Sequence, residues 1–347
     1  MTRGTSRRKA DHLRITLEED VAARGLTAGF ERVRLPHVAL PEIALDDVVL
    51  ETTFLGHSLG APLMISSMTG GTPEASVVNQ RLAAGAQEYQ LSMGVGSLRA
   101  AVEDPAVAQT YAIRDVAPDI LLLANIGAVQ LNYGFGIEHV RRAMDIVGAD
   151  ALILHTNPLQ EALQPEGNTD FRNLLKKVAA LRKKLNRPIV AKEVGWGISG
   201  EVARTLVEAG VDAIDVAGAG GTSWSAVERF RISDPVGQRV ADHFRDWGLP
   251  TVDAIQDVRH ALPDVPLVAS GGLRTGIDAA KAIALGADVS AMALPFLRAA
   301  AESEDAVDAV IREMIATIRI ALFATGSRTV ADLRTAYARR AGANGQQ

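Results

Sequence analysis

The chain has 347 residues and no cysteine, which excludes disulfides, thiolate metal sites and cysteine nucleophiles. Hydrophobic residues make up 48% of the chain and aromatic residues only 4%, and the net charge of −5 argues against non-specific binding to nucleic acid. We see no signal peptide before the first motif, and no apolar run reaches the roughly 18 residues that a membrane span needs. We therefore expect a cytoplasmic protein that does not insert into a membrane.

Residues 1–60 show no regular pattern and begin with a basic cluster. Arg7, Arg8 and Lys9 are followed by His12 in a chain that is acidic overall. One interpretation is a solvated, partly disordered N-terminus. The other is a clamp that folds over an anionic ligand such as a phosphate. The residues alone leave both interpretations open, so we treat 1–60 as an N-terminal extension.

A regular alternation of strands and helices is predicted from residue 61 onward. Each predicted strand is a short apolar run, as expected for a strand buried on both faces. The predicted strands are 62–67, 90–94, 120–125, 151–155, 189–193, 213–217, 267–270 and 289–293. The predicted helices are 74–89, 105–115, 136–147, 170–185, 199–209, 251–262, 276–285 and 304–324. This pattern predicts an α/β fold of the (β/α)8 TIM-barrel class over residues 61–326, followed by a C-terminal tail over 327–347.

Glycines and an arginine follow the seventh predicted strand, at Gly271, Gly272 and Arg274. Glycines allow close approach of the backbone to a ligand, and phosphate-binding barrels present N–H groups at this place. The alternative is a tight turn with no ligand. A Gly-Gly-Thr sequence that ends at Thr222, after the sixth strand, favours the phosphate. The phosphate would belong to a nucleotide-type cofactor whose ring lies across the mouth of the barrel.

Lys192 is unusual because it lies within the fifth predicted strand. A cation that points into a barrel needs a partner, since an unpaired buried charge is very costly. One interpretation is an internal ion pair with Glu193 or Asp215. The other places the ammonium against the N1/O2 edge of a flavin, where it would stabilise the reduced, anionic ring.

A second anion site is predicted from the polar residues after the first, second and fourth strands. Thr69, Ser97 and Arg99 offer hydroxyl and guanidinium groups, although a single arginine after a glycine turn is often only structural. Together with the basic N-terminus and His155, Arg99 would form part of a ring of cations. Glu161 cannot bind an anion directly, and beside such a ring its natural role is to hold Mg²⁺, which would bridge to phosphate oxygens.

From Arg8 to about Leu333 the chain resembles the type 2, FMN-dependent isopentenyl-diphosphate isomerase family. Many motifs occur in order at the spacing of that family, which makes the resemblance specific. They are Arg8-Lys9-x-x-His12, Met68-Thr69-Gly70-Gly71, Met93-Gly94-Val95-Gly96-Ser97-x-Arg99, His155-x-Asn157-Pro158-x-Gln160-Glu161, Pro165-Glu166-Gly167, Lys192-Glu193-x-Gly195-x-Gly197-Ile198-Ser199, Gly220-Gly221-Thr222-x-Trp224, Ser270-Gly271-Gly272-x-Arg274 and Ala293-Leu294-Pro295.

The resemblance implies which residues bind each ligand. Those that would bind FMN are Ser67, Met68, Thr69, Ser97, Asn125, Lys192, Ala217, Thr222, Gly271, Gly272, Arg274, Ala293 and Leu294. Those that would bind the substrate, mainly through its diphosphate, are Arg8, Lys9, His12, Ser97, Arg99, His155 and Asn157, with Gln160 near the isoprenoid carbons and Glu161 on Mg²⁺. Where the family commonly has Ser or Thr, this chain has Ala217, so one hydroxyl contact to the flavin is expected to be missing. The stretch after Leu333 is also shorter than the usual tail of the family.

The activity implied by the resemblance is a 1,3-allylic proton shift that converts isopentenyl diphosphate to dimethylallyl diphosphate. Reduced FMN would act as acid and base with no net redox change, NADPH would reduce the flavin, and Gln160 and His155 would assist catalysis. The resemblance also implies a homo-tetramer or homo-octamer. Two alternatives are an FMN-dependent 2-hydroxy-acid oxidoreductase, which would need a histidine base near Arg274, and a non-catalytic barrel that binds a phosphate ligand but rejects FMN.

Overall fold

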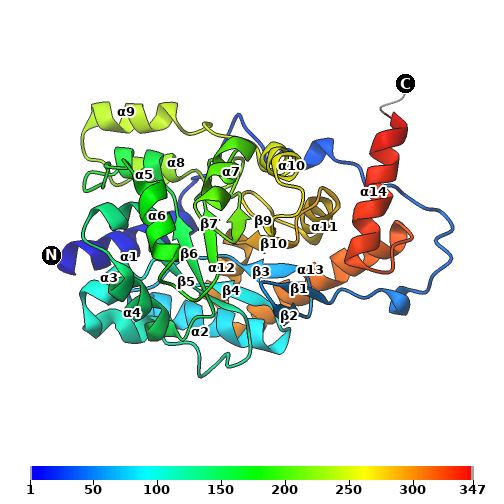
Figure 1. The fold of residues 1–347 in the computed structure, drawn as a ribbon, viewed down its shortest axis with the longest axis horizontal. Helices are drawn as coiled ribbons and strands as arrows, with labels where there is room; N and C mark the ends of the chain where they lie inside the picture. The colour runs from blue at the N-terminus through cyan, green and yellow to red at the C-terminus, as the bar shows by residue number, and fades with distance from the viewer. Residues whose placement is uncertain (1, 345–347) are drawn as a thin grey trace.

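The chain folds into a closed barrel of eight parallel strands surrounded by helices, as the sequence predicted (Figure 1). In the computed structural model the backbone of residues 2–344 and the side chains of residues 8–339 are described. The strands are β3 (Leu63–Ile65), β4 (Ser92–Gly94), β5 (Leu122–Gly127), β6 (Ala151–His155), β7 (Ile189–Lys192), β8 (Ala213–Asp215), β9 (Leu267–Ala269) and β10 (Val289–Met292). They pair in chain order, and β10 closes the barrel against β3.

Side chains of each strand enter two separate apolar layers. On β6, Ile153 points into the barrel interior, where it joins Met64 and Val268, whereas Leu152 and Leu154 pack outward against the helices. Successive side chains of a strand point to opposite faces, so a continuous apolar run fills both layers. This explains why the strands appear in the sequence as unbroken apolar runs.

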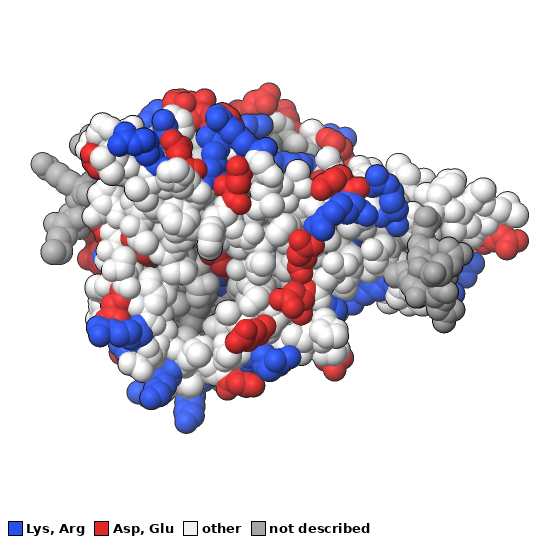
Figure 2. Space-filling model, turned by 90° about the horizontal axis from the view of Figure 1, so that it is seen from above, with Lys and Arg blue, Asp and Glu red and all other residues white. Residues whose placement is uncertain are grey.

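The helices enclose the barrel, with acidic and basic side chains interspersed on the face seen in Figure 2. They are α1 (Thr2–Glu18), α2 (Pro73–Glu88), α3 (Arg99–Glu103), α4 (Ile137–Val147), α5 (Pro158–Leu163), α6 (Leu174–Arg182), α7 (Gly200–Glu208), α8 (Trp224–Arg229), α9 (Pro235–His243), α10 (Thr251–Ala261), α11 (Gly276–Ala284), α12 (Leu294–Glu302), α13 (Glu304–Ala324) and α14 (Val330–Asn344). The 3₁₀ segments are η1 (Phe30–Arg32), η2 (Leu45–Asp47), η3 (Pro105–Tyr111) and η4 (Ala128–Asn132). Within the described part of the chain, none of these helices is both long enough and apolar enough to cross a membrane.

Several elements differ from the sequence prediction. The predicted helix 105–115 is the 3₁₀ segment η3, and the predicted helix 170–185 is the shorter α6. The sequence prediction missed α12, α14 and a hairpin of β1 (Thr52–Phe54) and β2 (His57–Leu59) before the barrel. The long loops after β6 and β8 contain α5, α8 and α9.

The N-terminal extension begins with a helix that packs on the carboxyl end of the barrel (Figure 1). Helix α1 contacts α3 and α8, and its Ile15 is 1% exposed. The chain after α1 is bound to the loop after β8, because Ala23 N donates to Gly221 O and Ser223 N donates to Val21 O. This packing favours the interpretation of the segment as a clamp over that of a solvated, partly disordered N-terminus.

At the amino end of the barrel, three Arg–Asp pairs each join the starts of two neighbouring strands, and we call each pair an arginine clasp. Arg259 pairs with Asp288 Oδ2 at 3.2 Å and donates to the carbonyl of Gly286, while Asp288 accepts from the backbone N of Leu267 at 2.8 Å. The clasp thus joins the starts of β9 and β10. The equivalent groups are Arg114 and Asp150 at the amino ends of β5 and β6, and Arg182 and Asp212 at the amino ends of β7 and β8. Fixing the strands at this end determines where their carboxyl ends lie, and the site is built there.

Candidate active site

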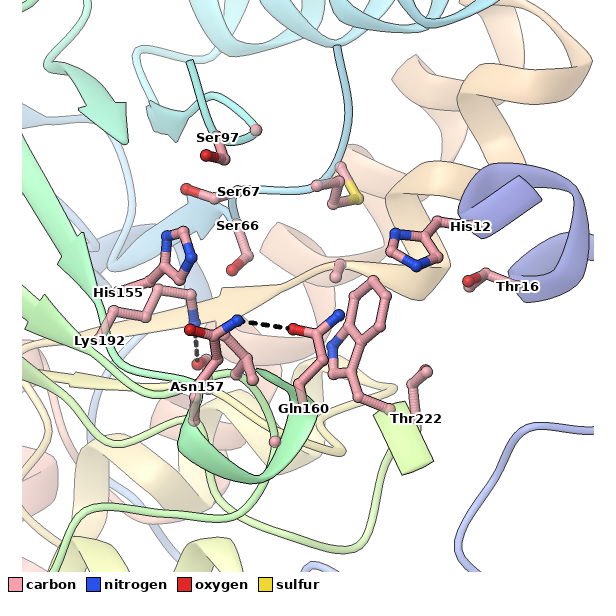
Figure 3. Close-up of a pocket in the computed structure, with 18 of the residues that line it drawn as sticks. His12, Thr16, Ser66, Ser67, Ser97, His155, Asn157, Gln160, Lys192 and Thr222 are labelled. Atoms are coloured by element: carbon pink, nitrogen blue, oxygen red, sulfur yellow. Dashed lines mark hydrogen bonds between the residues drawn. The ribbon is translucent and has the colours of Figure 1, made fainter. Parts of the chain in front are cut away.

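A cavity opens at the carboxyl ends of the strands, and every residue that the sequence assigned to a ligand lines it. Figure 3 shows part of this lining, including His12, Ser67, His155 and Lys192. The contributors are α1 and the loops that follow the barrel strands. The lining includes Arg8, Lys9, His12, Ser67, Met68, Thr69, Ser97, Arg99, Asn125, His155, Asn157, Gln160, Glu161, Lys192, Ala217, Thr222, Gly271, Gly272, Arg274, Ala293 and Leu294.

The buried Lys192 forms an ion pair with Asp215 and not with Glu193. Its Nζ lies 3.0 Å from Asp215 Oδ2 and 3.1 Å from the hydroxyl of Ser270, which itself donates to Asp215 Oδ1 at 2.5 Å. Glu193 turns away and accepts the backbone N–H groups of the turn from Val194 to Gly197. Burial raises the pKa of Glu193 to about 7 even though these N–H groups favour the carboxylate. Lys192 remains on the cavity wall, so the ion pair is compatible with a role beside a flavin.

The hydroxyl of Ser67 shows that the cavity wall fits a polar cofactor. Its Oγ is buried and has no hydrogen-bond partner among the described residues. A Cβ added at Gly94 would lie 2.4 Å from this oxygen, so the glycine in the neighbouring strand leaves room for the hydroxyl in this position. Buried hydroxyls in native proteins nearly always have a partner, which a bound cofactor would supply here.

The predicted phosphate site is a close packing of glycine backbone beside two arginines. Gly271 has a φ of 98°, and a Cβ at this position would lie 2.1 Å from the carbonyl oxygen of Gly218, so only glycine fits. Burial lowers the pKa of Arg274, and the nearby Arg298 lowers it further. Helix α12, which carries Arg298, begins at Leu294 in the cavity lining and adds the positive end of its dipole. The arrangement suits a phosphate group.

Elsewhere in the cavity, Lys9 is held by uncharged acceptors. Its Nζ donates to the carbonyl of Ser97 at 2.6 Å and to the hydroxyl of Tyr111, and lies over the Tyr111 ring at 4.9 Å from the centroid. Burial, and then repulsion from Arg8, lower the pKa of Lys9 to about 7. An anion placed here would restore the charge. The sequence prediction missed Tyr111, because nothing in a predicted helix distinguishes it from a core aromatic.

His155 is neutral in this environment. Its Nδ1 lies 2.7 Å from Asn125 Oδ1, so we assign the proton to Nδ1 and leave Nε2 as an acceptor in the free protein. Burial is the main cause that lowers its pKa to about 4, and the charges of Lys192, Arg8 and Lys9 act in the same direction. Asn125, which was predicted only as a flavin contact, therefore also orients the histidine.

The sequence prediction missed Glu228, a fully buried carboxylate at the centre of a network around Gln160. Its Oε1 accepts from Gln160 Nε2 at 2.9 Å and lies 2.9 Å from His12 Nε2, while Oε2 accepts from Arg231 at 2.6 Å. Burial opposes ionisation of Glu228, but these partners outweigh it and lower the pKa to about 2. His12, predicted to bind the substrate, lines the cavity and contacts Glu228 and the ring of Trp224, 5.1 Å between centroids. In the sequence Glu228 is one charge in a short helix, and it forms no motif with Gln160.

The carboxylate of Glu161 is the predicted Mg²⁺ ligand. Its Oε1 accepts from Asn157 Nδ2 at 3.1 Å and its Oε2 from the backbone N of Asn168 at 2.5 Å. The described residues contain no cluster of three His, Cys, Asp or Glu side chains that could hold a metal. Two buried amide oxygens in the same cavity, Asn157 Oδ1 and Gln130 Oε1, lack partners among the described residues. These oxygen groups fit a Mg²⁺ ion that takes its remaining ligands from substrate and water.

Comparisons with solved structures identify the fold. The structure of mandelate oxidase with (S)-2-phenylpropionate is 19% identical with a TM-score of 0.65, and 96% of each chain is covered. A variant of flavocytochrome B2 is 16% identical with a TM-score of 0.68, covering 94% of this chain and 82% of that one. At these identities the likeness concerns the fold alone.

Comparisons of sequence are more specific. Residues 139–340 match the family model described as FMN-dependent dehydrogenase. The isopentenyl-diphosphate delta-isomerase of Nostoc sp. is 57% identical over 95% of this chain and 94% of its own length, and that of Synechococcus sp. is 55% identical over 94% of each. The enzyme of that name from Rickettsia bellii is 48% identical over 96% of this chain and 97% of its own. The chain therefore belongs to the isopentenyl-diphosphate delta-isomerase family, in its FMN-dependent, type 2 form.

Proposed function

We propose that this protein converts isopentenyl diphosphate to dimethylallyl diphosphate with bound, reduced FMN. The observation that carries the proposal is the polarity of the cavity. Three cations of the lining lie within electrostatic reach of one another, since Arg8 acts on Lys9 and is itself acted on by Arg99. The ring of Trp224 adds apolar surface beside Gln160, because it packs on His12, which shares Glu228 with Gln160. A ligand with a diphosphate head and a short hydrocarbon tail matches both features.

The reaction needs a proton for an unactivated alkene, which is a very weak base. Glu228 is the buried carboxylate that accepts a hydrogen bond from Gln160, and its pKa of about 2 leaves it ionised and unable to donate a proton near neutral pH. Reduced FMN, when bound, supplies an electron-rich ring and exchangeable protons. Gln160 would orient the reacting carbons, because its amide is fixed at both ends by Glu228 and Asn157.

The electrostatics of the cavity support the remaining roles. Lys192 would stabilise the anionic reduced ring, with Asp215 keeping the ammonium in place. Arg8, Lys9, Arg99 and His155 would hold the diphosphate, and this fixes the tail in position for proton transfer. We further propose Mg²⁺ at Glu161 and NADPH as the reductant of the flavin. A cytoplasmic location remains a prediction from the sequence, and a homo-tetramer or homo-octamer remains a prediction from the family resemblance.

No observation favours a 2-hydroxy-acid oxidoreductase, although proteins of that type share the fold. Such an enzyme would need a histidine base beside Arg274. The histidines that line the cavity, among the described residues, are His12 and His155, which contact Glu228 and Asn125. The non-catalytic alternative gains no support either, because the chain matches relatives named as enzymes over nearly their full length.

The test is an anaerobic assay of the purified protein with isopentenyl diphosphate, FMN, Mg²⁺ and NADPH. We expect dimethylallyl diphosphate to form, NADPH oxidation to stop once the flavin is reduced, and chelation of Mg²⁺ to abolish turnover. If FMN is bound and reduced but no dimethylallyl diphosphate appears, the proposal is wrong. Reduction of the flavin by a 2-hydroxy acid in the absence of NADPH would favour the oxidoreductase instead.

A further inference from the structure

Asn168 contacts three groups in the cavity that no motif connects to it. Its side-chain Oδ1 accepts from Arg99 Nη1 at 3.3 Å and from Gln130 Nε2 at 3.2 Å. Its backbone N donates to Glu161 Oε2 at 2.5 Å. A single residue therefore joins the arginine assigned to the diphosphate to the carboxylate assigned to the metal.

The neighbouring glycine makes this contact possible. A Cβ added at Gly167 would lie 1.7 Å from the carbonyl oxygen of Glu161, closer than any side chain permits. The chain leaves Glu161 through α5 and returns tightly against the same residue at Gly167. This return brings the N–H of Asn168 to the carboxylate of Glu161, so the loop after β6 encloses its own metal ligand.

The guanidinium of Arg99 is also held on its Nε side. Its Nε pairs with Glu103 Oε1 at 2.9 Å, one helical turn away on α3, and Asn168 takes one of the two terminal nitrogens. With the guanidinium held on two sides, the remaining N–H groups have a fixed direction. A planar guanidinium in a fixed orientation is the arrangement that recognises phosphate oxygens most selectively.

We propose that Asn168 is a positioning residue that couples the binding of Mg²⁺ to the binding of the substrate diphosphate. The inference rests on the proposed function and extends it. A metal on Glu161 tightens the loop that carries Asn168, and Asn168 then holds Arg99 in the direction that the same diphosphate requires. Metal and diphosphate consequently bind more tightly together than separately, which is a coupling free energy between two ligands.

The experiment measures binding of inorganic diphosphate to the FMN-loaded protein by calorimetry, with and without Mg²⁺, and needs no turnover. In the wild type we expect Mg²⁺ to strengthen diphosphate binding. In Asn168→Ala, which keeps the backbone N–H but loses Oδ1, we expect this enhancement to fall by about fivefold, since the hydrogen bond from the charged Arg99 is lost. FMN affinity should not change. Asn168→Asp retains an acceptor oxygen and should keep the enhancement, although its added charge weakens binding of metal-free diphosphate.

Asn132 provides a matched control. Its Nδ2 donates to the carbonyls of Asp170 at 2.7 Å and Arg172 at 3.0 Å, so it anchors the same segment outside the site. Asn132→Ala should keep the enhancement of the wild type. The inference is refuted if Asn168→Ala keeps the enhancement within about twofold, or if both alanine variants lose it equally. A wild type that binds no diphosphate at all would refute the proposed function and this inference with it.

Discussion

Replacing Glu228 with glutamine tests the network that holds Gln160. Both carboxylate oxygens accept from donors: Oε1 accepts from Gln160 and lies beside His12, and Oε2 accepts from Arg231. A glutamine has the same shape but only one acceptor oxygen. Whichever way the amide is turned, its NH₂ group meets a donor, so at least one contact becomes repulsive.

The size of the effect follows from the burial of Glu228, which is 0% exposed. Breaking a buried ion pair by removing one partner costs about 3–5 kcal/mol, and a hydrogen bond to a charged group contributes about 1.5–3 kcal/mol. Arg231 keeps a second partner, Glu166, at 2.6 Å. We therefore expect Glu228→Gln to lower the free energy of unfolding by about 2–4 kcal/mol. A displaced Gln160 amide should lower turnover by a factor of about 10 to 100, equivalent to about 1.4–2.8 kcal/mol.

The assay combines kcat for the isomerase reaction, an FMN titration and a denaturant unfolding curve. The control is Glu166→Gln, since Glu166 is the other partner of Arg231 but its side chain is 45% exposed. An exposed pair contributes less than about 1 kcal/mol, so this variant should be nearly as stable as the wild type. If Glu228→Gln matched the wild type in kcat and in stability, the network would not position Gln160.

Three further predictions follow from the site and from the clasps. His155 should stay neutral down to about pH 4 in the free protein, and its NMR titration should show this. Because its pKa of about 4 is lower than the usual 6.5, the folded state binds fewer protons and stability should fall as the pH drops from 6.5 towards 4. A midpoint near 6.5 would contradict the burial argument. Asp212→Asn should lower the free energy of unfolding by about 1–2 kcal/mol through the loss of the Arg182 clasp, with unchanged FMN affinity as the check that the site is intact. Gln160→Ala should reduce turnover far more than FMN affinity, and loss of the flavin would show that the loop after β6 is placed wrongly.

Much of the site could be predicted from the sequence, because in a barrel of parallel strands the residues after each strand meet at one end. Ser67, Ser97, His155 and Lys192 follow or end different strands, and all four line the same cavity. Helix α14 could also have been predicted from the sequence. Thr329 and Asp332 cap its first turn, and Val330 and Leu333 repeat at helical spacing, yet this stretch was interpreted as a tail.

Other features depend on contacts between distant parts of the chain. The 3₁₀ form of η3 accompanies the packing of Tyr111 against Gly70, where a Cβ would lie 2.0 Å from the ring. The choice of Asp215 over Glu193 as partner of Lys192 depends on the turn after β7, which takes the Glu193 carboxylate for its own N–H groups.

Taken alone, the amino-acid sequence determined the barrel, the order of its strands and the residues at its mouth, since apolar runs and glycine turns are local properties of the chain. Only the tertiary structure decided how the mouth is covered and how its charges are paired. His12 and Glu228 are 216 positions apart by their numbers, 228 − 12, yet their side chains are 2.9 Å apart. A local sequence pattern cannot predict this pairing, because the pairing arises from the packing of α1 on α8.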